Sequence, residues 1–468
     1  MSNRITMKPE ELIDEQRTYF HSGKSRSLVS RKDALRALKT MLSAHESDIL
    51  EALKADMKKP IIEAYTSELS LLYHEIAMTI KNLKKWMRPV RVRTPLINFP
   101  ARSHIIPEPY GIIVIISPWN YPFYLALAPL IGALAAGNCV ILKPSELAPN
   151  SSHLLSELFQ KYFYSRTVVV AEGGPDTAYA LIQQRPDYVF FTGSTQTGRE
   201  IGKACGERLI PFTLELGGKN PCIVDEHIPL EVAARRIVWG KFFNAGQTCF
   251  APDFLLVHTS IKEKLLEKLI ETITSYYGTN PAQSPDYARI INRMQCRRLC
   301  SLLQEGVVRF GGKGDEKSNF IEPTIIDNIT WDSKIMQEEI FGPILPILEY
   351  CDLDATIDIL NKLNKPLALY FFSNDRVKQK KLQDRTISGS LCFNTAFTQI
   401  MNRNLPFGGI GESGMGKYHG KATFTTFSHL RSTMRSSLIF DLSVIYPPYR
   451  TSLEIVKKTL PWLYRSYI

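Results

Sequence analysis

The first 90 residues carry apolar side chains at the spacing of amphipathic helices. Leu35, Leu38 and Leu42 recur three and four positions apart, so that they fall on one face of a helix. The following stretch, residues 89–109, is rich in proline and β-branched residues. That composition favours extended chain over helix. The pattern therefore predicts a helical N-terminal region that leads into an extended arm.

From residue 111 onwards, short apolar runs alternate with helical segments. The runs 111–116, 139–142, 167–170 and 188–191 are expected to be strands, and the segments 123–136, 151–162, 178–184 and the chain from 199 onwards are expected to be helices. Continuous apolar runs are typical of strands that are buried on both faces. A second alternating series extends from about Pro221 to Phe393. The alternation predicts two doubly wound α/β domains with parallel sheets.

Composition limits the classes of protein. A chain of 468 residues with 44% hydrophobic and 22% charged residues is an ordinary globular protein of two or three domains. Residues 1–17 are polar, which argues against a secretory signal. The longest apolar stretch, 123–136, is interrupted by Pro129 and is shorter than the roughly 20 residues that span a membrane. We interpret it as a buried core helix.

The eight cysteines are scattered along the chain without a Cys-x-x-Cys pair. This distribution favours a reducing environment, so a cytoplasmic location is expected. Cys296 and Cys300 lie four residues apart in a helical stretch, which could form part of a metal site. Packing in a helix is the simpler interpretation, and no metal site is predicted.

The net charge of +11 is concentrated in two stretches. Residues 81–102 hold seven Lys or Arg and no acid, and residues 417–468 hold eight against two acids. The last residues, 446–465, also interleave aromatic and basic side chains. Contact with a membrane surface or nucleic acid is one interpretation. A solvated basic rim or an interface with a partner chain is the interpretation we favour. Binding to nucleic acid is supported only by the net charge, since the sequence has no recognisable nucleic-acid-binding motif.

Three polar residues are candidates for chemistry. Cys249 lies on a loop between an expected helix and strand, although most cysteines taken alone are inert. Glu215 precedes two glycines at the end of an apolar strand, where it is either a general base or a strand-end charge. Asn120 lies between Pro118 and Pro122, where its amide either donates to an oxyanion or forms a turn. No histidine lies near Cys249 to support a Cys-His protease pair.

Signals for a dinucleotide are individually weak. The Gly-x-Gly-x-x-Gly fingerprint is absent. Gly193 and Ser194 stand at a strand-to-helix turn, where free amides could hold a pyrophosphate, but any tight turn uses such residues. Lys143 and Glu146 follow a buried strand and could hold ribose hydroxyls or form a solvated loop.

Seven segments taken together resemble the aldehyde dehydrogenase superfamily. They are Ser117–Pro122, Lys143–Glu146, Phe191–Ser194, Leu214–Lys219, Gly246–Cys249, Glu338–Pro343 and Leu405–Gly409, and they occur in the family's order. The class 3 branch, which acts on fatty and aromatic aldehydes, is most similar in residues 119–122, in residues 414–420 and in its short N-terminus. The resemblance covers the chain from about Tyr19 to Arg435.

The resemblance implies a role for each candidate residue. Cys249 matches the nucleophile that forms a thiohemiacetal and then a thioester. The side chain of Asn120 and the backbone amide of Cys249 match the oxyanion hole, and Glu215 matches the base that activates water. The matches to cofactor positions are Lys143 and Glu146 at the adenosine ribose, Gly193 and Ser194 at the pyrophosphate, and Glu339 and Phe341 at the nicotinamide ribose. NAD is the expected cofactor, because Glu146 should repel a 2′-phosphate, but relatives of this class often accept NADP as well.

The resemblance also implies a domain organisation and partners. The expected units are a dinucleotide-binding domain (1–84 and 107–213), a catalytic domain (214–390), a bridging element (85–106 and 391–440) and a basic aromatic tail (441–468). A homodimer is expected, with no nucleic-acid partner and with at most peripheral membrane contact through the tail. The expected reaction is oxidation of hydrophobic aliphatic or aromatic aldehydes to carboxylic acids. The alternatives are a non-catalytic membrane-surface or scaffolding relative and a CoA-acylating aldehyde dehydrogenase.

Overall fold

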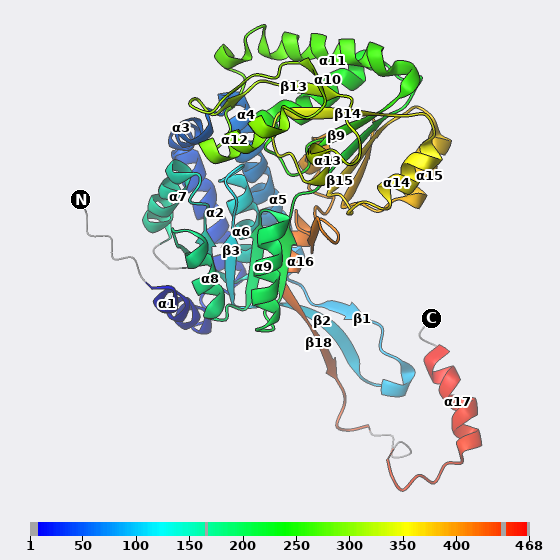
Figure 1. Cartoon of the computed structure of the whole chain (residues 1–468). Helices are drawn as coiled ribbons and strands as arrows, with labels where there is room; N and C mark the ends of the chain where they lie inside the picture. Colours follow the sequence, from blue (N-terminus) through cyan, green and yellow to red (C-terminus); the bar gives the residue numbers. More distant parts are fainter. Residues whose placement is uncertain (1–7, 164–166, 441–445, 466–468) are drawn as a thin grey trace.

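Two parallel sheets and one projecting arm organise the chain (Figure 1). The computed structural model describes residues 8–163, 167–440 and 446–465. Helices pack on the two sheets to form the body of the molecule, and the arm extends away from it. The α/β fold class predicted from the sequence is confirmed.

The first sheet has six strands in the order β17-β7-β6-β3-β4-β5. Five are parallel to one another, and β17 pairs with β7 in the antiparallel direction. The strands are β3 (Ile112–Ile116), β4 (Cys139–Lys143), β5 (Val168–Val170), β6 (Tyr188–Thr192), β7 (Phe212–Glu215) and β17 (Gly414–Met415). The four sequence-predicted strands of this region agree with β3 to β6 within one residue at each end.

Alternate residues of β3 enter two hydrophobic cores. Ile113 and Ile115 pack among the long N-terminal helices, whereas Ile112, Val114 and Ile116 pack on the opposite face. The helices around this sheet are α1 (Pro9–His21), α2 (Leu28–Ala44), α3 (Glu46–Met57), α4 (Ile61–Ala64), α5 (Ser70–Trp86), α6 (Tyr124–Ala136), α7 (Pro149–Tyr162), α8 (Pro175–Gln183) and α9 (Thr195–Gly206), with a π-helical turn η1 (Tyr65–Leu69) between α4 and α5. Every residue of α6 is buried, as expected for a core helix.

Three predicted helices begin earlier than expected: α7 at Pro149 rather than Ser151, α8 at Pro175 rather than Ala178, and α9 at Thr195 rather than Arg199. The helix expected from Arg199 begins at Thr195, because the hydroxyl of Ser194 accepts a hydrogen bond from the amide of Thr197 and caps the helix. The first turn is polar and lacks the apolar periodicity that marks a helix in a sequence.

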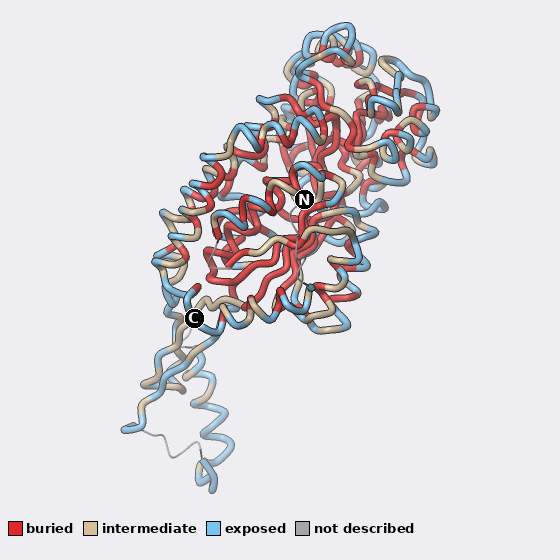
Figure 2. The backbone as a smooth tube through the Cα atoms, turned by 90° about the vertical axis from the view of Figure 1, so that its left-hand side faces the viewer, coloured by how far each residue is buried: buried red, intermediate tan, exposed pale blue. Residues whose placement is uncertain are grey.

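The second sheet has seven strands in the order β10-β13-β14-β9-β8-β15-β16. All neighbours are parallel except β10 and β13. The strands are β8 (Pro221–Val224), β9 (Phe254–His258), β10 (Val307–Phe310), β13 (Thr324–Asp327), β14 (Ile344–Tyr350), β15 (Ala368–Phe372) and β16 (Ser390–Phe393); the helices are α10 (Leu230–Phe242), α11 (Lys262–Tyr277), α12 (Arg293–Leu302), α13 (Lys334–Gln337), α14 (Leu353–Leu360) and α15 (Arg376–Arg385). Figure 2 shows the buried residues gathered along the strands of the body.

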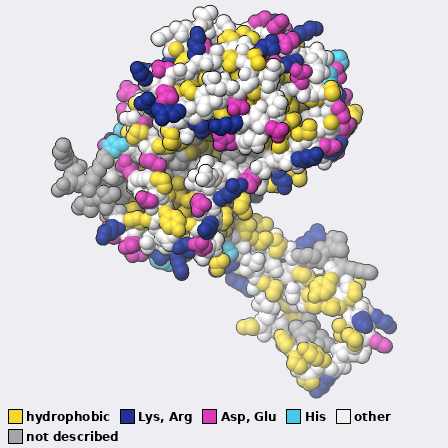
Figure 3. All heavy atoms as spheres, in the orientation of Figure 1, with side chains coloured by type: hydrophobic (Ala, Val, Ile, Leu, Met, Phe, Trp, Pro, Cys, Tyr) yellow, Lys and Arg dark blue, Asp and Glu magenta, His cyan; other side chains and the backbone are white. Residues whose placement is uncertain are grey.

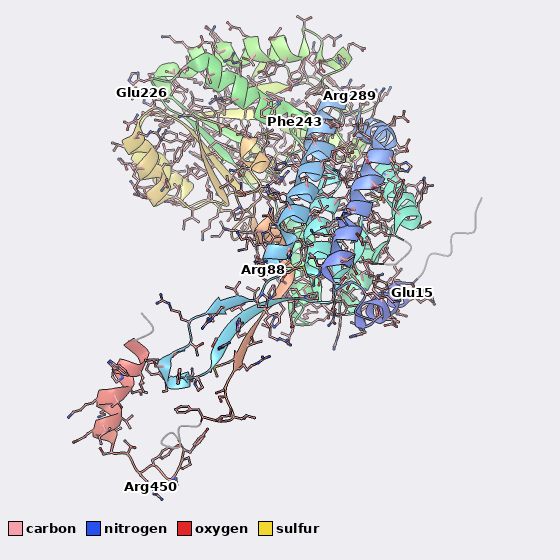
Figure 4. All side chains as sticks on the ribbon, turned by 180° about the vertical axis from the view of Figure 1, so that it is seen from behind. Glu15, Arg88, Glu226, Phe243, Arg289 and Arg450 are labelled. Carbon is pink, nitrogen blue, oxygen red and sulfur yellow. The ribbon has the colours of Figure 1, made fainter. Side chains whose placement is uncertain are left out.

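The arm is a three-stranded antiparallel sheet. Strands β1 (Val90–Val92) and β2 (Arg102–Pro109) are joined by a 3-10 turn, η2 (Leu96–Asn98), and β2 pairs with β18 (Ser428–Arg435). The short helix α16 (Lys421–Thr426) leads from the body into β18. In Figure 4, Arg88 lies where the arm leaves the body, and Arg450 lies beyond the strands of the arm, in the chain that leads to α17.

The domain boundaries given above remain a prediction. Strand β17 lies within the segment 391–440 that was assigned to the bridging element, yet it pairs with β7 of the first sheet.

Helix α17 (Leu453–Arg465) lies beside the arm and contacts η2. Residues 441–445 and 466–468 of the expected tail fall outside the described residues. Within the described parts of the chain, no helix combines the length and apolar character needed to cross a membrane.

Candidate active site

Cys249 lies where two cavities of different character meet. One cavity, here called the cleft, has a volume of about 610 Å³ and runs past the carboxyl end of the first sheet. The other, here called the tunnel, has a volume of about 330 Å³ and is lined mainly by apolar side chains. Cys249 lines both cavities. The thiol is therefore accessible from two directions at once.

The structure brings seven of the nine predicted site residues together in the cleft. They are Asn120, Gly193, Ser194, Glu215, Cys249, Glu339 and Phe341. Strands β3, β6 and β7 are parallel neighbours, and Asn120, Gly193 with Ser194, and Glu215 stand at or just beyond their carboxyl ends. Ligands of doubly wound sheets bind at this edge.

Lys143 and Glu146 do not line the cleft. Lys143 ends β4, next to β3, and its ammonium group donates to the carboxylate of Glu146 at 2.7 Å. The backbone amide of Ser117 donates to the carbonyl of Lys143 at 3.1 Å. The pair thus lies at the same edge of the sheet, one strand further from Cys249.

The backbone before Cys249 adopts an unusual conformation. Asn244, Ala245 and Gly246 have φ values of 54°, 51° and 74°, which lie in the left-handed region. A side chain at Gly246 would overlap the carbonyl of Gly342. Left-handed conformations cost free energy for residues other than glycine and are found preferentially at functional sites. The loop therefore stores strain next to the thiol, and the surrounding packing must hold it.

Burial controls the protonation of both candidate catalytic groups. Burial raises the pKa of the Cys249 thiol, and the nearby charges of Glu339 and Glu215 raise it further. Burial also raises the pKa of Glu215 well above its usual value, and neither oxygen of this carboxyl has a hydrogen-bond partner among the described residues. A buried carboxyl without partners in a cavity is suited to accept a proton from a molecule that enters.

Hydrogen bonds fix both the side-chain amide and the backbone carbonyl of Asn120. Its Nδ2 donates to the carbonyl of Gln247 at 3.0 Å, two residues before Cys249. Its carbonyl accepts from Nδ2 of Asn244 at 3.0 Å and from Nζ of Lys59 at 3.2 Å. Because an amide nitrogen carries two hydrogens, one remains to donate towards the cavity.

Glu339 and Phe341 form the wall of the cleft opposite the first sheet. A side chain at Gly217 would overlap the carboxylate of Glu339, so glycine is required there for the close approach. Burial raises the pKa of Glu339 to about 8. The ring of Phe341 packs edge-on against Trp119, with centroids 5.4 Å apart.

The tunnel was not predicted from the sequence. Its walls carry aromatic side chains from four separate parts of the chain, namely Tyr121, Tyr124, Trp239, Phe243, Phe250, Phe397, Phe407 and Tyr418. In Figure 4, the labelled Phe243 lies between the helices of the N-terminal region and the lobe that contains α10 and α11. Trp239 and Phe243 are four residues apart, so the sequence places them on one face of a helix. This pattern could have predicted one wall of the tunnel, but not the others.

Among the residues that the structure describes, no group of three or more His, Cys, Asp or Glu is placed to hold a metal ion. Cys296 of α12 is buried, and its sulfur lies 3.7 Å from the carbonyls of Asp315 and Phe320. These contacts are those of a packed side chain.

Comparisons with known proteins extend the likeness over most of the chain. Residues 6–433 match the model of the aldehyde dehydrogenase family. The chain is 45% identical to 4,4'-diaponeurosporen-aldehyde dehydrogenase of Staphylococcus aureus, over 96% of this chain and 98% of that protein. It is 43% identical to human aldehyde dehydrogenase family 3 member B1, over 92% and 93% of the two chains. A solved structure of the substrate-bound state of Staphylococcus aureus AldH superposes with a TM-score of 0.94 at 44% identity, over 96% and 99% of the two chains.

Proposed function

The chain belongs to the aldehyde dehydrogenase family, close to its family 3 members, and from that premise we propose that it oxidises hydrophobic aliphatic or aromatic aldehydes to carboxylic acids with NAD(P). The observation that carries the substrate class is that Cys249 lines an aromatic, apolar tunnel. Such walls favour apolar substrates because burial of apolar surface contributes about 25 cal/mol per Å². The carbonyl end would meet the thiol while the remainder stays in the tunnel.

Each of the three polar residues has a distinct task in this proposal. The sulfur of Cys249 adds to the aldehyde carbon, and the thiol proton passes to solvent water as the tetrahedral oxyanion adduct forms. Asn120 Nδ2 and the backbone amide of Cys249 donate to the oxygen of the adduct. Loss of hydride converts the adduct into a thioester. Glu215 then takes a proton from water, which attacks the thioester and releases the acid and the free thiol.

The lining of the cleft fits a dinucleotide. Gly217 lets the carboxylate of Glu339 approach closely, and Ser194 caps α9 just beyond the carboxyl end of β6. Enzymes of this family use NAD or NADP. When bound, the nicotinamide supplies the hydride acceptor. We propose NAD as the preferred form, because the carboxylate of Glu146 would repel a 2′-phosphate, with NADP as a weaker alternative.

The decisive experiment measures NADH and NADPH formation with aldehydes that range from short aliphatic to long-chain and aromatic. Turnover should be highest with apolar aldehydes and with NAD. The acid should form without CoA, since Glu215 provides a base for hydrolysis. Strict dependence on CoA would favour the acylating alternative. No turnover by the folded protein with any aldehyde would instead favour the non-catalytic, surface-binding alternative.

The arm and α17 support two further proposals about partners. We propose a homodimer, because β18 forms an edge of the arm and the arm extends away from the body of one subunit (Figure 3).

Peripheral membrane contact is proposed for α17, where Leu453, Ile455 and Trp462 are exposed. A cytoplasmic location stays a proposal that rests on the scattered cysteines. Sedimentation equilibrium tests the dimer, and co-sedimentation with anionic liposomes, with and without residues 446–468, tests the tail.

A further inference from the structure

A fully buried ion pair lies behind the loop that carries Asn120. Nζ of Lys59 and Oε1 of Glu68 are 2.7 Å apart, and both side chains are 0% exposed. Lys59 follows α3, and Glu68 lies in the π-helical turn η1. Burying two charges costs several kcal/mol of solvation free energy, and a pair of apolar residues often serves stability as well. The location of the pair therefore calls for an explanation other than stability.

Both partners direct their remaining hydrogen-bonding capacity at one loop, residues 117–123, between β3 and α6. Lys59 Nζ donates to the carbonyl of Asn120 at 3.2 Å and lies 4.1 Å from the centre of the Tyr121 ring. Oε2 of Glu68 accepts from the amides of Phe123 and Tyr124 at 2.9 and 3.1 Å. These amides open α6, where they have no partner within the helix. The pair thus fixes the middle of the loop with one charge and its end with the other.

The same loop is tied to the segment that carries the nucleophile. Asn120 Nδ2 donates to the carbonyl of Gln247 at 3.0 Å, and the Tyr121 hydroxyl lies 2.5 Å from Oγ1 of Thr248. Any shift of the loop would therefore move Asn120 relative to Cys249. An amide donor that stabilises an oxyanion must be held to a fraction of an ångström.

We propose that Lys59 and Glu68 are positioning residues that hold Asn120 at the geometry required to stabilise the oxyanion, an inference that rests on the function proposed above. Neither residue lines the cleft or the tunnel, so neither would touch the substrate or the cofactor. Their effect on catalysis passes through Asn120. The prediction is a selective loss of kcat, with little change in the KM for NAD.

The test is a double-mutant cycle between Lys59→Met and Asn120→Ala, read as kcat with NAD and a long-chain aldehyde. A displacement of about 1 Å can cost about 100-fold in rate, so Lys59→Met should lower kcat by about 10- to 100-fold when Asn120 is present. In the Asn120→Ala background the same change should lower kcat by less than about twofold, because interacting residues are not additive. Equal losses in both backgrounds would overturn the inference.

Two controls separate positioning from stability and from the proposed function. Lys262→Met also removes a largely buried lysine from ion pairs, with Asp327 at 2.8 Å and Glu349 at 2.6 Å, but Lys262 begins α11 and lines neither the cleft nor the tunnel. It should lower the melting temperature and leave kcat unchanged; a matching loss of kcat would show that instability alone explains the Lys59 variant. A wild-type kcat in Asn120→Ala alone would overturn the proposed oxyanion role, and this inference with it.

Glu68→Gln provides a second variant in case Lys59→Met does not fold. Glutamine can still accept from the amides of Phe123 and Tyr124, but it removes the charge that pairs with Lys59. We expect a loss of kcat of about three- to tenfold in the presence of Asn120, and none in the Asn120→Ala background. An unchanged kcat in folded Glu68→Gln would contradict the inference.

Discussion

The cleft and the tunnel share Cys249 and Leu125 as lining residues but are built in opposite ways. The cleft is formed by the carboxyl ends of parallel strands and carries Glu215, Glu339 and Lys219 among its lining residues. The tunnel is formed mainly by helices and loops, and its walls are aromatic rings. A hydride transfer needs both environments, since the dinucleotide is polar and charged whereas the proposed aldehyde is apolar. The sheet edge provides a fixed polar site, and the helical walls can vary to fit the substrate.

Substitution of the buried carboxyl Glu215 should give the largest effect on the polar side, because Glu215 lines the cleft together with Cys249. Glu215→Gln should lower kcat by roughly 10²- to 10⁴-fold, the usual contribution of a general base. One equivalent of NADH per subunit should still form, and the thioester should accumulate on Cys249, detectable as a mass increase of the intact protein. Glu412→Gln is the matched control, since Glu412 lines the same cleft and pairs with the exposed Arg199. An equal loss in both variants would contradict a specific role for Glu215.

The pH dependence of the wild type follows from the same residue. Burial holds the pKa of Glu215 well above its usual value, so the carboxyl is protonated at low pH and cannot accept a proton. As pH rises, the carboxylate form grows and kcat should rise with it. In Glu215→Gln this rise should disappear from the residual activity. A flat wild-type profile from acid to alkaline pH would argue against Glu215 as the base.

Asn120→Ala should have the next largest effect. Removal of one oxyanion donor costs about 10²- to 10³-fold in kcat. The KM for the aldehyde should change little, because the amide contributes mainly to the tetrahedral adduct. Asn364→Ala serves as control, as Asn364 lies on the exposed rim of the same cleft. A rise in KM without a loss of kcat would indicate that Asn120 binds the substrate rather than the adduct.

A pair of substitutions sharpens the comparison by testing separately the tunnel and the Lys143–Glu146 pair, which lies at the same sheet edge as the cleft. Trp239→Ala removes an aromatic wall of the tunnel and should raise the KM for long-chain aldehydes by about tenfold, with the KM for NAD unchanged. Glu146→Gln should shift the ratio of kcat/KM between NADP and NAD by about tenfold towards NADP, with the KM for aldehyde unchanged. Steady-state kinetics with both substrates varied measures this crossed pattern. If either variant changed the KM for both the aldehyde and the cofactor, the tunnel and the Lys143–Glu146 pair would not act independently.

The smallest expected effect concerns Glu63, a carboxyl in the apolar tunnel. Burial raises its pKa to about 8, and its carboxylate accepts from the amide of Asn244 at 3.0 Å. The folded state therefore binds a proton that the unfolded state releases, so this residue makes the protein less stable as pH rises from about 5 to about 8. In Glu63→Gln the melting temperature should fall less over this range, by a few °C. Glu51→Gln, an exposed carboxyl on α3, should follow the wild type.

The strands of the first sheet could be predicted because they are apolar on both faces. Ile112 to Ile116 form an unbroken apolar run between a glycine and a Ser-Pro pair. In a chain where such runs alternate with helical segments, a buried strand is the structure that best fits this run. The start of α9 could not be predicted in the same way, because its first turn is polar and only the cap at Ser194 marks it. Periodicity locates buried surfaces, whereas caps depend on single hydrogen bonds.

Sequence motifs located the cleft residues, but the tunnel and the Lys59–Glu68 pair depend on contacts across the chain. Lys59 meets Asn120 across 61 positions, and no local pattern encodes that contact. A signal for Glu68 did exist. Glu68 and Glu75 are seven residues apart among Leu69, Leu72 and Ile76, so charged side chains occupy a face that is otherwise apolar. Charged residues on such a face indicate that each has a buried partner, but only the folded structure identifies the partner.

The most direct test of covalent catalysis at the junction is NADH formation by Cys249→Ala with the best aldehyde found for the wild type. Turnover should fall by at least roughly 10⁴-fold, as expected when a nucleophile is removed, while NAD binding followed by fluorescence and the melting temperature stay close to wild type. Cys351→Ala, an exposed cysteine away from both cavities, should retain full activity. A Cys249→Ala variant that keeps turnover within tenfold of the wild type would contradict the account.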